Sequence, residues 1–179
     1  MIVPLSPLEV HDGDRDRPVI VCGIDGSEPG EGALTAAIAL AQRSGHELAV
    51  VHVADLASPR AAIPGVGAAP VSTGHAALVD RQREAVERLL SRAEHASRRH
   101  AVTVTTRTVP GDPPAVLEQV AADERATLIV VGSRGRAASG AALLGSTSMS
   151  LVGSAARPVM VVPPGGQQWL ERAATGGRA

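Results

Sequence analysis

Short, almost wholly apolar runs alternate along this chain with segments of helical periodicity, and this alternation constrains the fold most. Continuous apolar runs are typical of strands buried on both faces of a parallel sheet. The strands predicted in this way are residues 18–25, 47–53, 102–109, 126–132 and 158–163. The third strand alternates apolar and polar residues, which predicts a half-exposed strand at a sheet edge.

The segments between these runs carry helix signals. In the first, Leu34 and Ile38 recur at helical spacing and Gly45 is a typical helix end, while Asp112 and Pro113 mark the start of the third. The predicted helical segments are residues 26–45, 76–100, 111–124 and 145–156. The alternation therefore predicts an α/β fold, an open five-stranded parallel sheet with helices on both faces.

The 179 residues are enough for one domain with its own core. We expect a flexible leader at residues 1–17, a single domain at 18–163 and a flexible tail at 164–179. Within the domain, residues 55–75 are rich in Pro, Gly and Ala and predict a long loop.

Composition excludes several functions. The formal net charge of −1 gives no basic footprint for nucleic acid, and no apolar run is long enough for a membrane span. The chain has no lysine, which rules out a Walker-type phosphate loop and Schiff-base chemistry. Cys22 is the only cysteine, so we expect a buried thiol, no disulfide and a cytoplasmic protein. The histidines have no metal-ligand spacing, and we expect His52 to be packed or hydrogen-bonded.

A glycine-spaced loop, GSRGRAASGAALLGSTS, follows the fourth predicted strand and runs from Gly132 to Ser148. It ends at the start of a predicted helix, where unpaired N–H groups and the helix dipole favour anions. Hydroxyl side chains stand in the first turn, and Arg134 and Arg136 can add charge-assisted hydrogen bonds. These groups suit a phosphate. In an open parallel sheet, ligands bind at the carboxyl ends of the strands, where Asp25, Val53 and Gly132 stand.

The spacing of these glycines resembles the G-x2-G-x9-G-[S/T] motif of ATP-binding members of the universal stress protein family. The loop matches that motif without a gap. VIVCGIDGSEPGEGAL, ELAVVHV, GDPPAVL and RPVMVVP resemble further segments of the family in the same order, and together they span residues 18–163. The resemblance implies a Rossmann-like fold of the adenine nucleotide alpha-hydrolase-like type.

The resemblance also implies a site for ATP, with magnesium expected beside it. Ile24, Asp25 and Val53 would hold adenine and ribose, with Val131 and Gly132 beneath the ribose. The phosphates would lie against the loop and the first turn that follows it. The residues expected there are Arg134, Gly135, Gly145, Ser146, Thr147 and Ser148.

Several alternatives remain open at this stage. Asp25 could cap the following helix, and Gly132 and Gly135 could be turn glycines. The leading hypothesis is a regulatory ATP-binding protein of stress response with no catalytic residues. The alternatives are a slow ATPase, a cyclic AMP-binding protein and an interaction protein that binds no nucleotide.

The last predicted strand lies at a sheet edge in the strand order of the family. An exposed apolar edge favours aggregation unless it is covered. We therefore expect a homodimer that pairs Val159–Val162 of two copies, antiparallel about a two-fold axis. The competing cover is the tail of the same chain, around Trp169 and Leu170.

Overall fold

The computed structural model describes residues 17–54, 73–134, 144–166 and 168. Its strands are β1 (Val19–Ile24), β2 (Glu47–Ala54), β3 (Val104–Pro110), β4 (Leu128–Gly132) and β5 (Val159–Val162). Its helices are α1 (Glu28–Ser44), α2 (Thr73–His100), α3 (Pro113–Asp123) and α4 (Ser146–Ser154). The expected leader except Arg17, most of the loop 55–75 and most of the tail lie outside the described residues.

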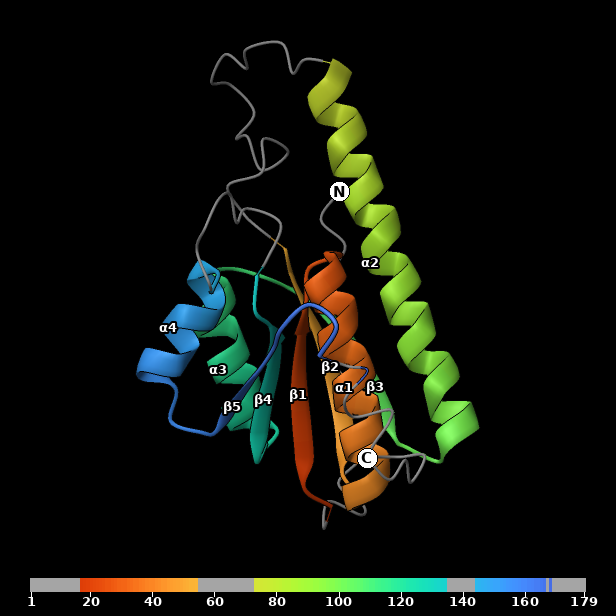
Figure 1. Cartoon of the computed structure of the whole chain (residues 1–179), viewed down its shortest axis with the longest axis vertical. Helices are drawn as coiled ribbons and strands as arrows, with labels where there is room; N and C mark the ends of the chain where they lie inside the picture. The colour runs from red at the N-terminus through yellow and green to blue at the C-terminus, as the bar shows by residue number, and fades with distance from the viewer. Residues whose placement is uncertain (1–16, 55–72, 135–143, 167, 169–179) are drawn as a thin grey trace, which may run out of the picture.

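The five strands form one sheet in the order β3-β2-β1-β4-β5, and every pair is parallel. The predicted α/β fold with an open five-stranded parallel sheet is therefore confirmed. β3 is half exposed at one edge, as its alternating sequence predicts, and β5 forms the other edge. The winding direction reverses between β1 and β4, which both end at the upper side of the sheet in Figure 1.

Helices cover both faces of the sheet (Figure 1). On one face α1 and α2 pack against alternate strand residues, and the fully buried side chains there include Ile20, Leu34 and Val50. On the other face α3 and α4 bury Ile129 and Leu151. Because successive side chains of a strand point to opposite faces, an almost continuous apolar run can fill both cores.

Local signals fix the ends of α1 and α3. Ser27 caps α1, since its hydroxyl accepts from the Gly30 N–H at 3.1 Å, and Gly45 closes the helix at φ 70°. Asp112 caps α3 by accepting from the Ala115 N–H at 3.4 Å, and Pro113 is the first helical residue. These boundaries follow the predicted ones to within two residues.

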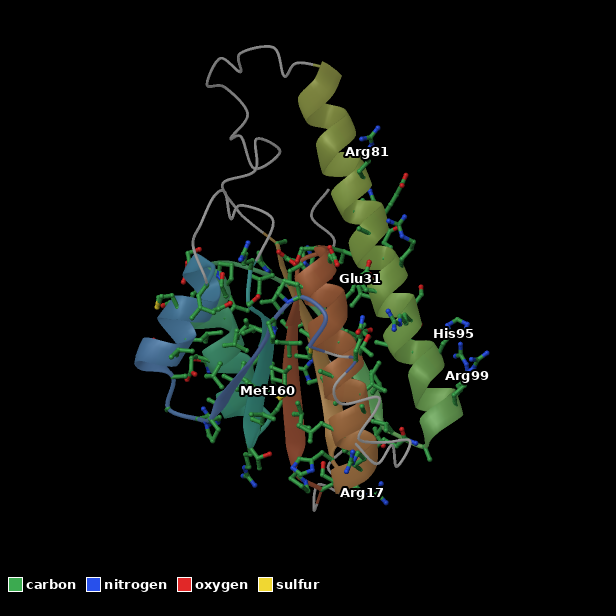
Figure 2. The ribbon with its side chains drawn as sticks, in the orientation of Figure 1. Arg17, Glu31, Arg81, His95, Arg99 and Met160 are labelled. Atoms are coloured by element: carbon green, nitrogen blue, oxygen red, sulfur yellow. The ribbon has the colours of Figure 1, made fainter. Side chains whose placement is uncertain are left out.

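One boundary differs from the prediction. α2 begins at Thr73, three residues before the expected Ala76, so the end of the expected loop 55–75 is helical. The expected loop extends to residue 75 because residues 55–75 are rich in Pro, Gly and Ala. Gly74 costs about 1 kcal/mol in a helix interior, and a long amphipathic helix tolerates that cost near its end. Its first turns rise above the sheet in Figure 1, and the exposed Arg81, His95 and Arg99 project from its outer side (Figure 2).

Candidate functional site

The carboxyl end of β1 leads into a short polar turn that starts α1. The Asp25 carboxylate accepts from the Ser27 N–H at 3.1 Å and from the Ser27 hydroxyl at 2.5 Å, while Gly26 adopts φ 78°. Ser27 in turn caps α1. Asp25 therefore orders the start of the helix through Ser27, which is the residue that caps it. The same carboxylate lies at the edge of the sheet where β1 ends.

Gly30 leaves room for this carboxylate. A Cβ built on Gly30 would lie 2.8 Å from the Asp25 Oδ1 atom, closer than side-chain atoms normally approach. Gly30, Ser27 and Asp25 thus form one packed unit. Sequence reasoning missed Gly30, because its role depends on where the Asp25 carboxylate lies in the folded turn.

The neighbouring strand ends lie beside Asp25. Ile24 is paired in register with His52 of β2, and the His52 Nδ1 atom lies 3.1 Å from the Ile24 carbonyl oxygen. A carbonyl only accepts, so Nδ1 carries the hydrogen and donates. His52 is therefore hydrogen-bonded, as expected. The Ile24 side chain is buried in the core and Val53 is half exposed.

Gly132 ends β4 against the first turn of α1. A Cβ on Gly132 would lie 2.6 Å and 2.7 Å from the carbonyl carbon and oxygen of Pro29. No side chain fits there unless the backbone of α1 moves. Gly132 is therefore required by the close approach of this helix, whatever its role toward a ligand. The side chain of the preceding Val131 is buried on the opposite face.

The helix after the glycine-spaced loop begins without a side-chain cap. Gly145 is the N-cap of α4, and no side chain accepts from its first turn. The Gly145 N–H donates to the Ser133 carbonyl at 2.7 Å, which joins the two ends of the loop. Ser146 is exposed and Thr147 is half buried, so both hydroxyls lie near the surface of this turn.

Ser148 differs from these two neighbours. Its side chain is 2 % exposed, and its hydroxyl donates to the Gly132 carbonyl at 2.6 Å. The buried Ser133 hydroxyl and the buried Nε atom of Arg134 have no hydrogen-bond partner among the described residues. Sequence reasoning did not single out Ser133, which stands next to Gly132 in the same loop. Gly135 lies outside the described residues.

Charge is distributed unevenly along the carboxyl edge. Asp25 and Asp112 follow β1 and β3, whereas Arg134 follows β4, and residues 125–170, which contain β4, the loop, α4 and β5, include no Asp or Glu. One half of the edge therefore favours groups that donate hydrogen bonds to carboxylates. The other half favours anions.

Other reactive groups contribute little to this site. Burial raises the pKa of the Cys22 thiol from 9.0 to about 12, so the thiol is neutral near pH 7 and does not act as a nucleophile. Within the described ranges, no three His, Cys, Asp or Glu side chains gather as metal ligands would. No helix of the described chain is both long and apolar enough to cross a membrane.

The sequence profile of the Universal stress protein family matches residues 17–163. A universal stress protein of Thermus aquaticus is 33% identical over 149 residues, which cover 80% of this chain and 96% of the relative. A universal stress protein of Mycolicibacterium smegmatis is 34% identical over 165 residues, and the match spans 50% of that longer protein. The chain therefore belongs to the universal stress protein family.

Solved structures share the fold. Universal stress protein UspA from Lactobacillus plantarum aligns with a TM-score of 0.62 at 24% identity, over 80% of this chain and 96% of that one. A universal stress protein in complex with cAMP aligns with a TM-score of 0.54 at 24% identity, over 83% and 98%. One from Archaeoglobus fulgidus in complex with dAMP aligns with a TM-score of 0.51 at 20% identity, over 81% and 96%.

Proposed function

We propose that this chain binds an adenine nucleotide, with ATP as the first candidate, and acts as a regulatory protein of stress response. Binding would change the shape of the protein or its choice of partner. Membership of the family supports this proposal, as do the related structures solved with cAMP and dAMP. The arrangement of the carboxyl edge supplies the physical argument.

The observation that carries the proposal is the uncapped start of α4 beside an unsatisfied arginine nitrogen. Helix N–H groups at Ser146, Thr147 and Ser148 have no partner from a capping side chain, and the Arg134 Nε atom is buried without an acceptor. An unsatisfied buried donor costs about 1–3 kcal/mol. A phosphate bound at this turn, with Gly135 and Gly145 leaving room for it, would accept from these donors.

The nucleoside would occupy the acidic half of the edge. The Asp25 carboxylate can accept from ribose hydroxyls, and the backbone at Ile24 and Val53 can meet the adenine ring. Val131 and Gly132 would lie beneath the ribose. This orientation places the uncharged end of the ligand near the carboxylates and the phosphates near arginine, as the charge distribution favours.

The identity of the bound nucleotide is tested by mass spectrometry of the small molecules released when the purified protein is denatured. Recovery of ATP supports the proposal as stated. Recovery of cyclic AMP, the ligand named for one structural relative, would favour a cyclic nucleotide sensor instead. Loss of all binding, both in this assay and in titration with ATP, cyclic AMP and dAMP, would favour an interaction protein instead.

Magnesium would enter with the polyphosphate. Mg²⁺ is usually held by one or two carboxylates together with substrate phosphates. The phosphate half of the edge offers the hydroxyl oxygens of Ser146 and Thr147 but no carboxylate between residues 125 and 170. The residues therefore fit a metal that ATP brings with it, and they do not fit a metal held by the protein alone.

We do not expect rapid catalysis at this site. Residues 125–170 include neither a carboxylate nor a histidine that could act as a general base near the terminal phosphate. Asp25 and His52 would stand at the nucleoside end. We expect ATP turnover slower than about one per minute, against an enzyme median of ~10 per second. A rate near that median in a phosphate-release assay would favour the ATPase alternative.

We further propose a homodimer through β5. The Pro158 and Val162 carbonyls accept from β4, so in a parallel ladder the amide groups of Val159 and Val161 point away from the sheet. If two copies of β5 pair antiparallel about Met160, the amide groups of Val159 in one copy can hydrogen-bond with those of Val161 in the other. Met149 and Val152 of α4 are exposed apolar side chains, at 57% and 56%.

A further inference from the structure

The Ser148 hydroxyl makes a contact that is unusual for a serine within a helix. Its hydroxyl leaves α4 and donates to the carbonyl of Gly132, the last residue of β4, at 2.6 Å. Ser154 of the same helix shows the ordinary arrangement, in which the hydroxyl donates to the Ser150 carbonyl one turn earlier at 2.8 Å. Ser148 is 2 % exposed, so water does not compete for its hydrogen bond.

A second hydrogen bond anchors the same turn. The Gly145 N–H donates to the Ser133 carbonyl at 2.7 Å, so the first turn of α4 is attached to two consecutive carbonyls at the end of β4. The N–H groups of Ser146 and Thr147 lie between these two anchors. Their direction is therefore set by the end of the strand as well as by the helix.

Gly132 also lies against the first turn of α1. On its other side, a Cβ on Gly132 would lie 2.6 Å from the carbonyl carbon of Pro29, two residues after the Ser27 cap that Asp25 holds. One glycine thus contacts α1, whose start Asp25 orders through Ser27, and α4, the helix that would bind phosphate. The spacing between the two halves of the site depends on both contacts.

We infer that Ser148 is a positioning residue, which fixes the phosphate-binding N–H groups of α4 through the Gly132 carbonyl and does not bind phosphate with its own hydroxyl. This inference rests on the proposed function. A serine hydroxyl has one hydrogen to donate, and Gly132 receives it. The lone pairs that remain on the oxygen would repel a phosphate oxygen.

The first arm of the test uses the ligand-free protein. Amide hydrogen exchange by NMR measures the Gly145 N–H in the wild type, in Ser148→Ala and in the matched control Ser154→Ala. We expect exchange of the Gly145 amide to accelerate about tenfold in Ser148→Ala and to stay unchanged in Ser154→Ala, since loss of a buried hydrogen bond loosens the turn. Unchanged exchange in Ser148→Ala would overturn the anchoring role.

The second arm is calorimetric titration with ATP and with adenosine. We expect Ser148→Ala to lower the affinity for ATP about tenfold and to leave the affinity for adenosine unchanged. Ser148→Thr, which keeps the hydroxyl, should recover ATP binding. Equal losses for both ligands would mean a general structural defect and would overturn the inference. If the wild type binds ATP and Ser148→Ala binds it equally well, the inference fails and the proposed function stands. If the wild type binds neither ligand, the proposed function fails and the inference fails with it.

Discussion

Replacement of Gly132 by alanine tests the close approach between β4 and α1. The added Cβ would lie 2.6 Å, 2.7 Å and 2.9 Å from three atoms of Pro29, two of them backbone. Ordinary contacts begin near 3.4 Å, so the first turn of α1 must shift by several tenths of an ångström. Overpacking of this kind lowers the free energy of unfolding by about 1–3 kcal/mol.

The loss is measured by urea denaturation and by calorimetric melting. A loss of about 2 kcal/mol lowers the melting temperature by roughly 4–8 °C for a domain of this size. Gly153→Ala is the matched control, because a Cβ there meets nothing within 4 Å on the exposed side of α4. This control should be neutral or stabilising by up to about 1 kcal/mol.

A Gly132→Ala protein that melts within about 1 °C of the wild type would refute the packing argument. The variant should also bind ATP more weakly, since movement of α1 displaces Ser27 and with it Asp25. A normal affinity together with the expected loss of stability would separate the structural role of Gly132 from any role toward the ligand.

Three further predictions follow from other parts of the molecule. Gly145→Val combined with Ser146→Ala should abolish ATP binding in calorimetry. The circular dichroism spectrum should stay unchanged, because Gly145 has φ −74° and ψ 164°, which any residue adopts. A spectrum of an unfolded chain would contradict this expectation. Val161→Asp should yield monomer or aggregate by light scattering; a monomeric wild type that dimerises after deletion of residues 167–179 would instead identify the tail as the cover of β5. Cys22 should resist alkylation at pH 8 until the protein unfolds. Because its folded pKa of about 12 lies above 9.0, its contribution to stability should fall as pH rises from 9 toward 12.

The sequence predicts the elements of this fold because each depends on its own residues. Apolar runs define strands such as Val19–Ile24, and capping residues such as Asp112 define helix ends within one turn of chain. The parallel arrangement follows from the alternation of strands and helices. Even the exposed character of β3 is visible in its alternating sequence.

The site is only partly visible in the sequence. Spacing identifies the glycine loop, but the reason for Gly132 lies in Pro29, which is distant along the chain and close only after folding. The direction of the Ser148 hydroxyl depends in the same way on the placement of α4 against β4. From sequence alone the three hydroxyls of residues 146–148 are equivalent, and burial separates one of them from the other two.

The central place of β1 has a consequence for synthesis of the protein. β1 is made first, yet one of its two partners is β4, and the Val19 carbonyl accepts from Thr127, 108 residues later. While the chain is still growing, β1, β2 and β3 can pair, but the other edge of β1 stays open until β4 leaves the ribosome. Contacts of such long sequence separation form slowly, and an open apolar edge is prone to pair with other chains. During the interval between synthesis of β1 and of β4, this edge of β1 is therefore open to pairing with other chains.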